Sequence, residues 1–181
     1  VVINDFTALA LSLPALDASL LRQVGGSAAE PAGAIGLIGA GTGLGVSGLV
    51  FPHGASQPAA LAGEGGHVTL PAETEIEFRV LRHLQQRYGH ASAERVLCGQ
   101  GLVDLYHALR SIRGGGAAYV QHAAQVTAPA LEGSDPLAVE VLAMFCGWLG
   151  CVAGNLALTL GARGGVYIGG GIVPRLGGWF D

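Results

Sequence analysis

The clearest hydrophobic pattern early in the chain is a pair of short apolar runs on either side of a glycine-rich stretch. The runs cover residues 34–39 and 46–51, and residues 40–45 between them are rich in glycine. Two such runs around a turn of this kind predict a β-hairpin. A third apolar run, residues 166–168, predicts another strand that leads through a glycine turn into a helix.

Helical periodicity describes most of the remaining chain. Residues 73–88 carry apolar side chains at helical spacing, with Gly89 as the C-cap. Asp135 followed by Pro136 predicts the start of a long helix that runs to about residue 160. Further helices are expected over residues 5–13, 93–98, 101–112 and 117–133, with a strand end at residues 1–3 and turns over residues 52–66. The pattern is mixed α/β.

The end of the long helix raises a membrane alternative. Residues 141–160 contain no charged side chain, and this stretch is long enough to span a bilayer. However, Asn155 and several glycines interrupt this stretch, and no basic cluster flanks it. A helix buried against a sheet is therefore the favoured interpretation, and no membrane partner is expected.

Composition and charge exclude several classes of protein. The net charge is −4 and every basic residue is Arg, so the chain lacks the basic footprint of a nucleic-acid-binding protein. Without Lys it can hold neither a Walker P-loop nor a Schiff base. The three cysteines form no CxxC pair, which indicates a reducing compartment and predicts no cysteine metal site.

The glycine-rich stretch is the first candidate site. Gly41, Gly43 and Gly45 would let backbone N–H groups converge on phosphate oxygens, and Thr42 adds a hydroxyl. The spacing also matches a dinucleotide fingerprint, but a strand rather than the required helix follows. Phosphate binding at a hairpin turn and a plain tight turn both stay open.

A carboxylate and an imidazole form the second candidate, in the segment Gly63-Glu64-Gly65-Gly66-His67. Together Glu64 and His67 can accept from, and donate to, the hydroxyls of one small polar ligand. The alternatives are a metal pair, for which no third ligand lies nearby in the sequence, and a solvated loop.

The remaining candidates each have a purely structural alternative. Asp5, after Asn4, is either a general base for a substrate hydroxyl or a helix cap. Glu94 lies early in its helix, where an acidic residue favours the helix dipole. Gly169, Gly170 and Gly171 let a ring or a phosphate approach the backbone, or simply join a strand to a helix.

The order of these motifs is more specific than any one of them. From residue 1 to about residue 175, the succession closely resembles the bacterial glucokinase family. The motifs are Asn4-Asp5-Phe6-Thr7-Ala8, then GAGTGLGV from Gly39, GEGGHV from Gly63, GHASAERVL from Gly89, GNLAL from Gly154 and GGGIVP from Gly169.

The resemblance implies a fold and an activity. The fold is the large α/β domain of a two-domain, actin-like (ribonuclease H-like) sugar kinase, with a mixed sheet flanked by helices. Residues 1–24 would be a hinge segment that carries the catalytic base and residues 25–181 the large domain, with the small domain and a C-terminal return segment absent. The activity is the ATP-dependent phosphorylation of the glucose 6-hydroxyl, the first step of glycolysis, by a cytoplasmic homodimer.

The same resemblance assigns the site residues. Asp5 would be the general base, and Asn4, Asp5, Glu64, His67 and Glu94 would contact glucose. The residues at 41–45 would bind phosphate, Gly169 to Gly171 would lie in the adenosine site, and Mg²⁺ would arrive with ATP, with no metal site of the chain's own. The first phosphate loop of the family has no counterpart in this sequence, so we expect the isolated chain to be inactive. A sugar-binding regulator on the same scaffold, or a kinase for another hexose, are the alternatives.

Overall fold

A four-stranded mixed sheet organises the fold. The computed structural model describes residues 2–25, 28–54, 57–116 and 119–180. Strands β1 (Ile35–Ala40) and β2 (Leu44–Val50) pair antiparallel and form the predicted hairpin. Strand β4 (Val166–Gly169) pairs parallel to β1, and β3 (Ala59–Ala62) pairs antiparallel to β2, so the order is β3-β2-β1-β4. The predicted mixed α/β class is confirmed.

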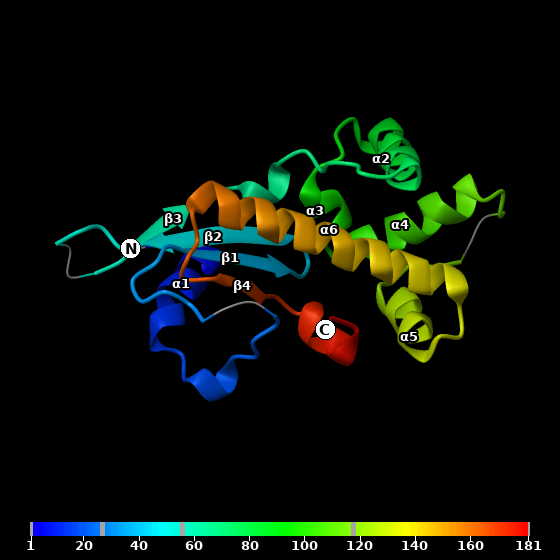
Figure 1. The fold of residues 1–181 in the computed structure, drawn as a ribbon. Helices are drawn as coiled ribbons and strands as arrows, with labels where there is room; N and C mark the ends of the chain where they lie inside the picture. The colour runs from blue at the N-terminus through cyan, green and yellow to red at the C-terminus, as the bar shows by residue number, and fades with distance from the viewer. Residues whose placement is uncertain (1, 26–27, 55–56, 117–118, 181) are drawn as a thin grey trace.

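Both faces of the sheet are covered by helices (Figure 1). On one face, Ile38 and Ala40 of β1 join a large core with the long helix α6 (Pro136–Leu160). On the other face, Leu37 and its neighbours pack against helix α1 (Asp5–Ser12). Because successive side chains of a strand point to opposite faces, a single apolar strand supplies both layers.

The other helices extend the core beyond the end of the hairpin (Figure 1). They are α2 (Glu75–Tyr88), α3 (Ala93–Val96), α4 (Gly99–Ile112) and α5 (Ala124–Glu132). Short 3₁₀ segments connect or extend the elements at Leu13–Ala15, Ala18–Leu20, Gly65–His67 and Val173–Phe180. The predicted caps Gly89 of α2 and Asp135 of α6 are both present, and Ser92 caps α3.

Four local predictions were wrong. Residues 2 and 3 belong to no strand, and Val2 is fully exposed, while residue 1 lies outside the described residues. The stretch predicted as turns contains β3, whose alanines satisfy their backbone groups by pairing with β2. Helix α5 begins only at Ala124, and the predicted residues 117–118 lie outside the described residues. Helix α4 begins at Gly99, because the Sγ of Cys98 caps it.

Helix α6 is apolar because it is a core helix. It is the one helix among the described residues that is long and apolar enough to cross a membrane. Its buried positions, which include Val141, Phe145 and Leu149, follow helical spacing and face the sheet and its neighbouring helices. Gly161 ends the helix in the left-handed conformation.

The start of α6 gives a test of the fold. The carboxylate of Asp135 accepts the N–H groups of Leu137 at 2.9 Å and Ala138 at 3.3 Å, and the Tyr106 hydroxyl donates to it at 2.7 Å. Asp135→Ala removes all three contacts, so we expect the free energy of unfolding of the full-length protein to fall by about 1–2 kcal/mol. Denaturant titration measures this. Asp135→Asn keeps the acceptor and should lose less; an equal loss in both variants would contradict the role of the cap.

Candidate functional site

Helix α1 begins at the site and is capped by Asn4 rather than by Asp5. The Oδ1 of Asn4 accepts the N–H of Phe6 at 2.8 Å and that of Thr7 at 3.4 Å. Asn4 therefore has the capping role that was the structural alternative for Asp5. The Asp5 side chain accepts the adjacent Phe6 N–H at 2.8 Å and is exposed on the first turn of α1. A carboxylate in this position is open to a ligand.

The ring of Phe6 fixes the position of Asp5 against the sheet. It lies over Gly39 and Gly45, which are register partners in the hairpin. A Cβ on Gly45 would collide with the ring atoms of Phe6, so the ring packs directly on the backbone of β2. Because Asp5 is the preceding residue, this contact brings its carboxylate to the hairpin turn.

The glycine-rich turn (residues 41–45) is held by hydrogen bonds on its own backbone. The N–H of Gly41 donates to the carbonyl of Gly43 at 2.9 Å, and the N–H of Gly99, at the start of α4, donates to the carbonyl of Gly41 at 2.9 Å. Within the described part of the chain, the N–H groups of Thr42 and Gly43 have no hydrogen-bond partner. Free N–H groups of successive residues are the donors that a phosphate oxygen requires.

Glu64 directly precedes the 3₁₀ segment Gly65–His67 beside the turn, and His67 is the last residue of that segment. A Cβ on Gly66 would collide with the backbone carbonyl of Leu44, so this segment approaches β2 more closely than any other residue type would allow. The His67 Nε2 lies 4.0 Å from Glu64 Oε2, and both side chains are largely exposed. The pair is adjacent, as the sequence predicts, and accessible to a ligand.

Glu94 reaches the same turn from α3. Its Oε2 accepts the N–H of Leu44 at 3.0 Å. Ser92 caps α3 by accepting the N–H of Arg95, which leaves the Glu94 carboxylate free of any capping role. A residue 50 positions away along the chain thus contacts the turn directly.

These elements enclose a hollow of about 240 Å³. Its lining combines three carboxylates with the backbone of the glycine-rich turn. The lining residues are Asp5, Phe6, Gly39, Gly41, Thr42, Gly43, Leu44, Gly45, Glu64, Glu94 and Gly170. Most of the residues singled out from the sequence therefore come together in one place.

The other candidate residues do not line this hollow. Asn4 uses its side-chain oxygen as the cap of α1, and the His67 Nε2 lies 4.0 Å from Glu64 Oε2. Gly169 is the last residue of β4, and Gly171 follows it at the surface, so Gly170 alone represents that candidate segment in the hollow.

Cys98 has a structural role, and the described residues contain no cluster of metal-ligating side chains. Burial raises the pKa of the Cys98 thiol, and its Sγ accepts the N–H of Gly101 as a helix cap. Among the described residues, no group of three His, Cys, Asp or Glu side chains could hold a metal ion.

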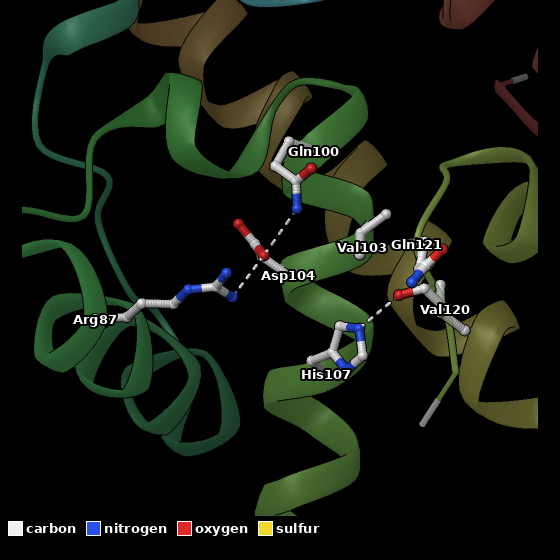
Figure 2. A pocket seen from close by; sticks show the side chains of 7 residues that line it. All are labelled: Arg87, Gln100, Val103, Asp104, His107, Val120 and Gln121. Atoms are coloured by element: carbon white, nitrogen blue, oxygen red, sulfur yellow. Dashed lines mark hydrogen bonds and ion pairs between the residues drawn. The ribbon is translucent and has the colours of Figure 1, made fainter. Parts of the chain in front are cut away.

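A second hollow, of about 480 Å³, lies where α2 meets α4 (Figure 2). It is lined by Arg87, Gln100, Val103, Asp104, His107, Val120 and Gln121. The Asp104 carboxylate is 3% exposed and accepts from Arg87 at 2.8 Å, from the Tyr88 hydroxyl at 2.6 Å and from Gln100 at 3.1 Å. Burial and the bond to Asp104 raise the pKa of Tyr88. These polar groups satisfy one another, and they anchor α4, whose first residue, Gly99, holds the glycine-rich turn.

Sequence reasoning missed two residues of the site. Phe6 entered the sequence analysis only as part of a motif. An aromatic residue next to Asp5, together with glycines on the two strands of the expected hairpin, is the signal that indicates a ring packed on the strands. The Leu44 N–H was missed because its partner, Glu94, is distant along the chain and no local pattern joins them.

Comparison with known proteins agrees with this geometry. A family model described as glucokinase matches residues 1–181. The chain is 54% identical to a glucokinase of Aromatoleum aromaticum over 181 residues, which is 100% of this chain and 54% of that protein. It is also 54% identical to a glucokinase of Chromobacterium violaceum over 180 residues, which is 99% of this chain and 51% of that protein. The chain thus spans about half the length of the curated relatives it matches.

A solved structure supports the same assignment. The crystal structure of a glucokinase from an Antarctic psychrotroph superposes with a TM-score of 0.90 at 38% sequence identity, over 98% of this chain and 54% of that one. The similarity therefore extends through the whole architecture that carries the hollow. This chain belongs to the glucokinase family.

Proposed function

We propose that the full-length protein carrying this chain transfers the γ-phosphoryl group of ATP to the 6-hydroxyl of glucose. The observation that carries the proposal is the convergence of Asp5, Glu64 and Glu94 on the glycine-rich turn in one hollow. Carboxylates suit a hydroxylated sugar, and free backbone N–H groups suit phosphate, so the hollow combines the requirements of both substrates. Family membership supports the same reaction.

Asp5 is the proposed general base. Its carboxylate accepts the proton of the sugar 6-hydroxyl as the oxygen attacks the γ-phosphorus. A bond forms between that oxygen and phosphorus, the bond to the β-phosphate oxygen breaks, and ADP leaves. The Phe6 ring on Gly45 keeps the base at a fixed place beside the turn, and fixed placement supplies much of the catalysis in phosphoryl transfer.

The other carboxylates are proposed to hold the sugar. Glu64 and Glu94 line the hollow from two separate segments and can each accept from ring hydroxyls, while His67, beside Glu64, can donate to one. Asn4 keeps one side-chain group for a hydroxyl, because only its Oδ1 is used in capping α1. The site would distinguish hexoses by which of their hydroxyls reach these groups.

Phosphate is proposed to bind at Thr42 and Gly43, whose N–H groups point to no partner in the described residues. Gly170, at the edge of the hollow, is proposed to border the adenosine, with Gly169 and Gly171 beside it. Mg²⁺ usually keeps several waters and binds substrate phosphates with one or two carboxylates, so it would enter with ATP. When bound, it would neutralise charge that develops on the phosphates. A cytoplasmic homodimer is the proposed assembly, on the strength of the family resemblance.

The base assignment gives the first test of this function. Asp5→Asn keeps the size of the side chain and one acceptor oxygen, but it cannot take up the proton of the sugar hydroxyl. We expect kcat for glucose to fall by about 10²–10⁴-fold, with a smaller change in KM. A coupled assay of glucose 6-phosphate formation with ATP, Mg²⁺ and a panel of hexoses measures both constants.

Asp17→Asn is the matched control, because it makes the same chemical change at an exposed carboxylate that caps a 3₁₀ segment outside the hollow. It should keep the wild-type kcat. Full turnover by Asp5→Asn would refute the base. A folded wild-type protein that binds sugar but phosphorylates no hexose would favour a sugar-sensing function instead.

The Phe6 contact gives a second test. In Gly45→Ala the new methyl group must displace the Phe6 ring and, with it, Asp5. Since a displacement of about 1 Å can cost roughly 10²-fold in rate, we expect kcat to fall about 10- to 100-fold while the protein stays folded by circular dichroism. Gly147→Ala, where nothing lies within 4 Å, is the control for an added methyl group. An unchanged kcat in Gly45→Ala would show that the ring does not position the base.

A further inference from the structure

The bond between Glu94 and Leu44 joins the sugar side of the hollow to its phosphate side. The acceptor belongs to a carboxylate that the proposed function assigns to the sugar, and the donor lies within the glycine-rich turn. A residue that only contacted sugar would have no need to reach the backbone of that turn. The distance of 3.0 Å between Oε2 and the Leu44 nitrogen is that of an ordinary hydrogen bond.

The turn is shaped to receive this carboxylate. A Cβ built on Gly43 would lie 2.5 Å from Glu94 Oε2, so any side chain at position 43 would push the carboxylate away. Leu44 itself is buried, with 4% of its surface exposed, and burial makes an unpaired N–H costly. The lack of a side chain at Gly43 leaves room for the carboxylate, and the buried N–H of Leu44 needs an acceptor there.

Helix α3 holds Glu94 rigidly. Ala93 and Val96, on the same short helix, are fully buried, and the N–H of Ala93 donates to the carbonyl of Val68 at 2.9 Å. That bond also ties α3 to the segment that follows His67. The Glu94 carboxylate is therefore presented by a fixed backbone rather than by a mobile loop.

One carboxylate can serve both substrates at the same time. Its two oxygens offer about four lone-pair sites, and the Leu44 N–H occupies one of them. Glu94 is half-buried and lines the hollow, so the remaining sites can accept from a sugar hydroxyl. A sugar that fixes the carboxylate then also fixes the turn.

We propose that Glu94 is a positioning residue for the glycine-rich turn, in addition to a sugar contact, and that this shared bond couples glucose binding to nucleotide binding. The proposal rests on the proposed function for the identity of the two ligands. By linkage, glucose should raise the affinity for nucleotide by the same factor by which nucleotide raises the affinity for glucose.

Two variants of the full-length protein distinguish the effect of Glu94 on the turn from its contact with the sugar. Glu94→Gln and Glu94→Met both remove the negative charge, and their side chains have similar length. Only Gln keeps an oxygen that can accept the Leu44 N–H. A difference between them therefore reports the hydrogen bond rather than the charge, and binding measured without sugar excludes the sugar contact.

The first measurement is amide hydrogen exchange at Leu44 without ligands. We expect protection to be retained in Glu94→Gln and exchange to be at least about fivefold faster in Glu94→Met, since the loss of one neutral hydrogen bond is of this order. The second is calorimetric titration with Mg²⁺ and ADP without glucose. The Met variant should bind ADP roughly fivefold more weakly than the Gln variant, and glucose should tighten ADP binding in wild type but not in Met.

Equal Leu44 exchange in the two variants would overturn the positioning role. So would equal ADP affinities in the absence of glucose, because a residue that contacts only sugar would give that result. A wild-type protein that binds no ADP would count against the proposed function instead, and the exchange at Leu44 would still decide whether Glu94 holds the turn.

Discussion

The close approach of separate segments to one end of the hairpin is the constraint on which the site depends. At Gly45 the ring of Phe6 lies directly on the strand, and at Gly66 the backbone meets the carbonyl of Leu44 at a distance that leaves no room for a Cβ. Each contact carries a carboxylate to the turn, because Asp5 precedes the ring and a second acid, Glu64, comes just before the 3₁₀ segment Gly65–His67. These glycines therefore set how near the functional side chains can come to the turn.

Much of the fold was predictable because its signals are local. The hairpin, the long helix α6 and the cap at Asp135 each follow from apolar spacing with turn or cap residues beside them. Strand β3 was not predictable in this way, since a short run of alanines with one leucine has no strong strand preference and forms a strand only by pairing with β2. The start of α4 was missed because Cys98, an uncommon cap, supplies its sulfur as the acceptor.

The site was predictable to a similar extent, and for the same reason. The glycine-rich turn and Glu64, whose motifs contain their own signal, were found from the sequence and line the hollow. The structural alternative named for Asp5, a helix cap, was wrong: Asn4 takes that role, and both residue types suit an N-cap position. The contact from Glu94 to the turn depends on how α3 packs, and only the folded chain shows it.

In the proposed function, one hollow holds the sugar and the phosphates together. The most direct measurement is a crystal structure of the full-length protein with glucose and ADP bound. We expect the glucose 6-hydroxyl to lie within hydrogen-bonding reach of the Asp5 carboxylate, about 2.6–3.2 Å, with the ADP phosphates beside Thr42 and Gly43. Glucose bound outside this hollow, or with its 6-hydroxyl turned away from Asp5, would refute both the shared hollow and the role of Asp5.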